Sequence, residues 1–173
     1  AMFNSFASTL GSPIMEVRWA KRGLEKPPIL ERWNAYSRLT VHDDAPQWPE
    51  GWGFSPDFRP TRPVKQLWLR MDSLAGTLLT GYAGDLGSVD YLQYDITNLA
   101  HFLRPSGKVL IIGAGGGRDI LSALFFKQPS ITAIELNEDI IDIVNNKFGD
   151  FTGHLDRLPQ VTFVKDEARS WIA

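Results

Sequence analysis

A glycine-rich turn between an apolar run and a helical pattern is the first place where this sequence could hold a ligand. Glycine permits positive φ angles and removes the Cβ atom that would keep a ligand away from the backbone. The start of the following helix adds amides with a partial positive charge. We therefore predict that this turn contacts the polar part of a nucleoside cofactor. It consists of Gly113, Ala114, Gly115, Gly116 and Gly117.

Acidic residues follow the next two predicted strands. Glu135 lies 22 residues after Gly113, where a carboxylate can accept hydrogen bonds from the two hydroxyls of a ribose. The alternative is an acid at the surface with no ligand. Asp166, Glu167 and Ala168 follow the third strand, where one of the acids could bind the amino group of an adenine, although isolated acids are common at strand ends.

The glycine spacing argues against a dinucleotide. The dinucleotide fingerprint requires a third glycine at position 118 for close helix–strand packing, and this chain has Arg118 there. NAD is therefore the weaker cofactor candidate.

Alternating strands and helices must position these residues. Apolar residues at steps of three and four predict a helix from Asp90 to about Leu103, and an uninterrupted apolar run predicts a buried parallel strand. The second half of the chain, 86–173, is thus a β-α-β-α-β unit, the N-terminal half of an α/β Rossmann-like domain. Its predicted strands are 108–112, 130–134 and 161–164, with helices at 118–127 and 137–148.

Residues 1–85 form a different, β-rich region. Residues 36–41 alternate as a half-buried strand does, and 65–71 with 77–82 predict a hairpin. Between them, the segment 43–63 is predicted to be a loop, because proline lacks the amide that a central strand needs. Its aromatic residues serve either packing or an aromatic lid over a substrate: Trp48, Trp52 and Phe54.

Composition excludes several functions. The chain of 173 residues has no cysteine, which excludes thiol catalysis, disulfides and thiolate metal sites, and its three histidines lack ligand spacing, so no metal is expected. With 18 basic and 20 acidic residues and a net charge of −2, no basic field exists for nucleic acid. Apolar runs are far shorter than the roughly 20 residues of a membrane helix. Residues 1–3 do not begin a signal peptide, and we expect the chain to be cytosolic and part of a longer protein.

The residues of the turn and its surroundings resemble spermidine synthases, the polyamine aminopropyltransferase branch of the S-adenosylmethionine-dependent methyltransferase superfamily. The segment 109–117 is similar to their first nucleoside-binding motif, with aliphatic Ile111 where ordinary methyltransferases usually have an acid. The segment 134–137 resembles their strand-end acid and helix cap, and 167–172 resembles their acid-Ala-Arg stretch, with Asp166 as the other possible register.

This resemblance implies S-adenosylmethionine or decarboxylated S-adenosylmethionine as cofactor and a small amine as substrate, with transfer of an aminopropyl or methyl group. It implies that Leu136 belongs to the cofactor site beside Glu135, that Asp119 binds the cofactor's amino group and that Tyr94 and Asp95 contact the substrate. Relatives also occur fused to membrane-spanning segments in bacteria, so the parent can be membrane-attached with this domain in the cytosol.

The sequence departs from the family pattern in three respects. Asp95 and Ile96 replace a Gln or His and a Glu that hold substrate, and Gly116 replaces an acid in the turn. The family's catalytic acid follows a fourth strand, and the sequence as given ends after the third, so the catalytic residues are unknown. A non-catalytic nucleoside-binding or regulatory module is the alternative function. We also expect copies of the chain to associate through an exposed sheet edge or helix faces.

Overall fold

The computed structural model describes residues 17–21 and 23–173. The chain forms two compact units. Within the described residues, the first comprises 17–45 and 66–78, and the second comprises Pro46–Lys65 and Leu79–Ala173. The proline-rich loop thus belongs to the unit that also contains the glycine turn, whereas the sequence suggested a division near residue 85. The expectation about residues 1–3 lies outside the described residues.

The first unit is built from antiparallel strands. β3 (Leu30–Trp33), β4 (Arg38–His42), β5 (Gln66–Met71) and β6 (Ala75–Thr80) form one sheet in that order, and β1 (Trp19–Ala20) pairs with β2 (Gly23–Leu24). The predicted strand at 36–41 is confirmed as β4 and the predicted hairpin as β5 and β6. Asp72 and Ser73 make the tight connection at φ angles of 47° and 71°.

A buried cation organises the strand β4. All five residues of β4 are buried, and Arg38 is only 4% exposed. Its guanidinium donates to Glu25 at 2.6 Å and to Glu31 at 2.8 Å. Two carboxylates are needed because a buried charge is tolerated only when it is paired and hydrogen-bonded.

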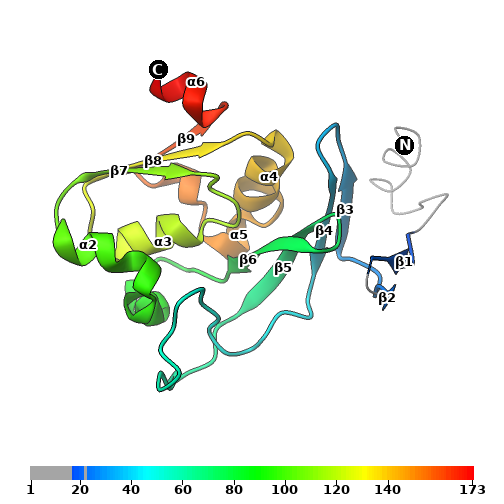
Figure 1. Ribbon diagram of the computed structural model, residues 1–173, viewed down its shortest axis with the longest axis horizontal. Helices are drawn as coiled ribbons and strands as arrows, with labels where there is room; N and C mark the ends of the chain where they lie inside the picture. Colours follow the sequence, from blue (N-terminus) through cyan, green and yellow to red (C-terminus); the bar gives the residue numbers. More distant parts are fainter. Residues whose placement is uncertain (1–16, 22) are drawn as a thin grey trace. The chain divides into compact units, whose positions relative to one another are not determined.

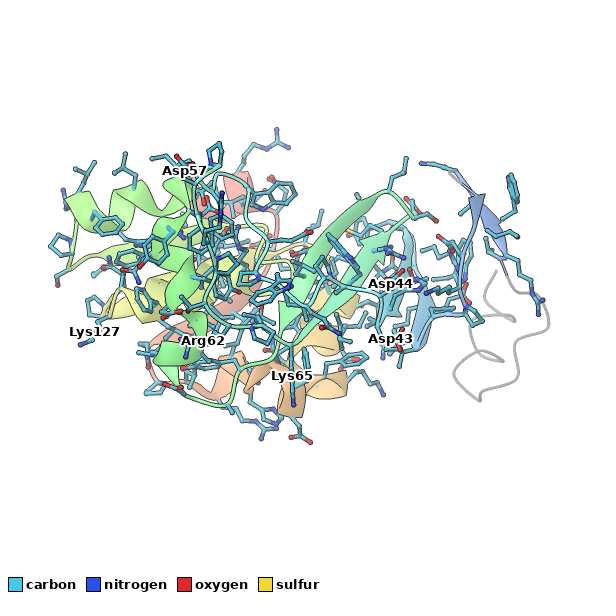
Figure 2. The ribbon with its side chains drawn as sticks, turned by 90° about the horizontal axis from the view of Figure 1, so that it is seen from below. Asp43, Asp44, Asp57, Arg62, Lys65 and Lys127 are labelled. Carbon is cyan, nitrogen blue, oxygen red and sulfur yellow. The ribbon has the colours of Figure 1, made fainter. Side chains whose placement is uncertain are left out.

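In the second unit, the predicted loop is confirmed, but the predicted single helix at 90–103 is wrong. We name Pro46–Lys65 the Pro/Trp loop; Asp57, Arg62 and Lys65 mark its course in Figure 2. The chain forms a 3-10 helix η1 (Leu86–Tyr94), a break at Asp95, a short 3-10 turn η2 (Ile96–Asn98) and α2 (Leu99–Leu103). Asp95 has extended angles, φ −89° and ψ 123°, because its carboxylate accepts hydrogen bonds from the loop and from Thr97.

The predicted parallel strands are confirmed, but the expected burial of the strand at 108–112 is wrong, since only Ile111 among its five residues is buried. β7 (Lys108–Ile112), β8 (Ser130–Glu135) and β9 (Val161–Lys165) form a three-stranded parallel sheet in that order. The elements between them are α3 (Arg118–Phe125), α4 (Glu138–Asp142), the π-helix η3 (Ile143–Lys147), α5 (Gly149–Thr152) and η4 (Leu155–Arg157), and α6 (Ala168–Ile172) follows β9. Asn137 caps α4 as predicted, since its side chain accepts the Asp139 amide.

One face of this sheet is covered more completely than the other. In Figure 1, α3 and α6 lie on opposite sides of the sheet. Ile111 and Ala133 are 6% and 0% exposed, whereas Leu110 and Ile112, whose side chains alternate to the other face of β7, are 40% and 63% exposed. β7 pairs only with β8 among the described strands, so it is also an edge of the sheet.

Candidate nucleoside-binding site

The carboxyl ends of the three parallel strands bring the predicted site residues together. Ile112 at the end of β7 is in register with Ile134, and Glu135 is in register with Lys165 of β9. The glycine turn, Glu135 and Asp166 therefore follow three neighbouring strands at one edge of the sheet. This is the edge where ligands bind in open α/β sheets.

The turn is closed by backbone hydrogen bonds. The amides of Gly113 and Ala114 both donate to the carbonyl of Ile134, at 2.9 and 3.0 Å, and Gly117 donates to Ala114. Gly113, Gly115 and Gly117 have φ angles of 75°, 49° and 86°, which favour glycine. A Cβ atom on Gly113 would meet no atom within 4 Å, so the space beside the turn is open there.

Glu135 lies against this turn. Its Oε2 accepts the Gly115 amide at 3.0 Å, and its Oε1 accepts the Asn137 amide at 3.0 Å. The residue is 8% exposed. A carboxylate has about four acceptor positions, so two remain for further donors such as ribose hydroxyls. The participation of the Asn137 amide is not evident from the sequence, although a strand-end acid before a helix cap places that amide within reach.

The acids after β9 differ in their surroundings. Glu167 caps α6 by accepting the Ser170 amide at 3.2 Å, and it pairs with Arg169 at 3.0 Å. The hydrogen bond from Arg169 is the main cause that lowers the pKa of Glu167. Asp166 is exposed, and its Oδ1 accepts the Glu167 amide at 2.7 Å. Since Glu167 is occupied by its own helix, Asp166 is the acid better placed to meet a ligand. Ala168 begins α6.

The remaining predicted cofactor contacts are Asp119, Gly116 and Leu136. Asp119 lies in the first turn of α3 and is exposed. Burial lowers the pKa of His101 in α2, and the negative charge of Asp119 partly offsets this effect. Gly116 is buried, and Leu136 is 45% exposed beside Glu135.

Tyr94 and Asp95, the predicted substrate contacts, are neighbours with opposite environments. Tyr94 is 56% exposed, and its ring packs on Phe58 of the Pro/Trp loop with centroids 5.0 Å apart. It lines two cavities, of about 460 and 290 Å³, that flank this loop; neither is lined by the glycine turn or Glu135. Asp95 is 1% exposed, and it forms an ion pair with Arg118 at 2.5 Å.

Burial opposes the ionisation of Asp95, but hydrogen bonds from Arg118 and Thr97, with the charge of Arg118, outweigh it and lower the pKa to about 2. Because the folded pKa lies below the unfolded value, this group stabilises the fold fully above about pH 4 and loses its contribution as the pH falls through 2. The loss should be about 2 kcal/mol.

We therefore expect urea unfolding between pH 4 and 2 to show a steeper fall in stability for wild type than for Asp95→Asn. Asp57→Asn, an exposed acid of the Pro/Trp loop, is the matched control and should follow wild type. Equal slopes for wild type and Asp95→Asn would contradict the assignment.

No family model and no curated protein matches the sequence. Solved structures do match the fold, and two of them are spermidine synthases. A spermidine synthase in complex with the transition state analogue AdoDATO is 17% identical with a TM-score of 0.52, and the match covers 84% of this chain and 42% of that chain. A spermidine synthase from Thermotoga maritima is 16% identical with a TM-score of 0.49 and the same coverage.

The chain therefore has a spermidine synthase-like, α/β Rossmann-like fold, as the sequence predicted, and it spans less than half the length of these solved proteins. Among the described residues, no helix is both long and apolar enough to cross a membrane. Nor does that part of the chain contain a group of three or more potential metal ligands.

Proposed function

We propose that this chain binds S-adenosylmethionine or decarboxylated S-adenosylmethionine and is the nucleoside-binding part of a spermidine synthase-like transferase that moves an aminopropyl or methyl group to an amine. The observation that carries the proposal is the contact of Glu135 with the Gly115 amide at the mouth of the turn. The likeness of the fold to a spermidine synthase in complex with AdoDATO supports the choice of ligand.

The residues present fit such a ligand. Glu135 keeps acceptor positions for two ribose hydroxyls, the open space beside Gly113 admits the nucleoside, and Asp166 lies one strand further along for the adenine amino group. A bound sulfonium cofactor supplies an electrophilic carbon for an amine. The task of this chain is then to hold the nucleoside so that this carbon faces the amine in line.

A calorimetric titration tests this proposal with four ligands: S-adenosylmethionine, decarboxylated S-adenosylmethionine, methylthioadenosine and NAD. The three sulfur nucleosides should bind, and NAD should bind much more weakly because Arg118 replaces the third glycine. NAD binding tighter than the sulfur nucleosides, or no binding by any of them, would overturn the proposal.

A second candidate function is a regulatory module that binds the nucleoside without chemistry. It is favoured by the environment of Asp95, which is buried in an ion pair at a position where the family carries a residue that holds substrate. Nucleoside binding by the full-length protein without turnover of any polyamine would support the module, and measurable aminopropyl transfer would exclude it.

We also propose that copies of the chain associate through the edge of β7, where Leu110 and Ile112 are exposed. An unpaired strand edge with apolar side chains favours association. Sedimentation of wild type should show a concentration-dependent dimer that Ile112→Lys weakens, and a strictly monomeric wild type would contradict it.

A further inference from the structure

The carboxylate of Asp95 joins three segments that are distant in sequence. It accepts the Trp52 amide of the Pro/Trp loop at 2.9 Å and the amide and hydroxyl of Thr97 at 3.0 and 2.8 Å. The third partner is Nη2 of Arg118, at 2.5 Å. The side chain of Asp95 is 0% exposed. Charge-assisted hydrogen bonds to a buried carboxylate are strong, so Asp95 holds all three segments together.

The Pro/Trp loop is held here by its backbone rather than by its aromatic rings. The ring of Trp52 projects outward, since this residue is 80% exposed. The Ile96 amide donates to the Gly53 carbonyl, and Phe54 forms a β-bridge with Asp95. A Cβ atom on Gly53 would clash with Cγ2 of Ile96. A side chain at this position would therefore force either the loop or the Ile96 side chain to shift.

The other end of the connection lies beside the glycine turn. Arg118 is the first residue of α3 and directly follows Gly117. Its side chain is 11% exposed, and its Nε is buried without a hydrogen-bond partner. Asp95 is the acid that pairs with this cation, so loss of Asp95 would leave a buried charge that must move toward water. Movement of Arg118 displaces the first turn of α3 and, with it, the amides of the turn.

We propose that Asp95 is a positioning residue that couples docking of the Pro/Trp loop at Trp52 to the geometry of the glycine turn, so that each stabilises the other. The coupling itself needs no ligand. One consequence rests on the proposed function: a nucleoside bound at the glycine turn also favours the docked loop. By linkage, the loop strengthens nucleoside binding by the same factor.

The test changes the loop and reads the result at the turn. Gly53→Ala perturbs the loop where it meets Ile96. Its added Cβ atom would also lie 3.2 Å from Oδ1 of Asp95, but Arg118 pairs with the other oxygen, Oδ2. Hydrogen exchange at the Gly115 amide, followed without ligand, should become at least about tenfold faster in this variant and in Asp95→Asn. The double variant should be no faster than either single variant, because both break one connection.

Arg62→Gln is the matched control. Arg62 also ties the Pro/Trp loop to η1, through an exposed pair with Asp90 and a bond to the Gly87 carbonyl, but it is not next to the turn. Its Gly115 exchange should stay within about twofold of wild type. A purely structural role of Asp95 would lower global stability without this non-additive local response. If both variants fail to fold, Thr97→Val, which removes one hydrogen bond to Asp95, should give an intermediate acceleration.

Titration with S-adenosylmethionine separates this proposal from the proposed function. In wild type, the nucleoside should slow exchange at the Trp52 amide, and Gly53→Ala should weaken binding several-fold. Failure of wild type to bind any nucleoside would defeat the proposed function alone, since the exchange experiment needs no ligand. Folded Gly53→Ala or Thr97→Val with wild-type exchange at Gly115 would overturn the coupling.

Discussion

Replacement of Glu135 by Gln is expected to weaken S-adenosylmethionine binding at least about 100-fold, or about 2.7 kcal/mol. The carboxylate accepts one backbone amide on each oxygen, from Gly115 and Asn137. Glutamine has a single oxygen, so its NH₂ group must face one of these amides, and its capacity to accept ribose hydroxyls falls. Hydrogen bonds to a charged acceptor contribute about 1.5–3 kcal/mol each, so loss of the charge alone has a large effect.

Calorimetry at fixed salt measures this change, with circular dichroism to confirm that the variant is folded. Glu138→Gln is the matched control: it lies three residues along the chain, is exposed and pairs with Lys165 rather than with the turn. Its binding should stay within about twofold of wild type. Wild-type affinity of a folded Glu135→Gln variant would show that the nucleoside does not use this carboxylate.

Local patterns were sufficient to predict the core of the candidate site. The run 109–112 is apolar without alternation, which is typical of a parallel strand, and β7 spans Lys108–Ile112. Coverage of both faces did not follow, because Leu110 and Ile112 are exposed. The glycine turn and Glu135 could be placed together because parallel strands end at the same edge of a sheet. Each of these inferences depends on residues close in sequence and on one rule of topology.

The break at Asp95 could not be predicted in this way. Leu92, Ile96 and Leu99 continue a helical period across it, yet Ile96 and Leu99 are 63% and 48% exposed. The break is caused by distant partners, the Trp52 amide and the Arg118 guanidinium, and periodicity contains no information about either. The one local signal was the pair Asp95 and Thr97, which has the spacing of an N-terminal cap.

The division of the chain also depended on such distant contacts. A change in composition near residue 85 suggested that the Pro/Trp loop belongs with the N-terminal strands. Its backbone instead bonds to Asp95 and Ile96, so it is part of the second unit. Segments rich in proline form few hydrogen bonds of their own, and their place in a fold is therefore decided by their partners.

Gly117→Ala is expected to destabilise the second unit by about 3 kcal/mol, from two separable causes. Its φ of 86° is unfavourable for alanine by about 1–2 kcal/mol. A Cβ atom there would also lie 2.5 Å from Cδ1 of Leu155. Leu155 is 0% exposed and cannot move aside freely, so overpacking adds about 1–3 kcal/mol.

Two matched glycines separate these causes in urea unfolding experiments. Gly84 has a φ of 87°, and a Cβ atom there would meet nothing within 4 Å, so Gly84→Ala should show the backbone cost alone. Gly113→Ala should cost about the same, because its φ is 75° and its surroundings are open, but its methyl group would occupy the space proposed for the nucleoside. Stability losses that are equal at Gly117 and Gly84 would show that Leu155 yields. A Gly113→Ala variant that is nearly as stable as wild type and binds the nucleoside normally would show that the ligand does not lie beside Gly113. The added methyl group would otherwise occupy the ligand's space and weaken binding.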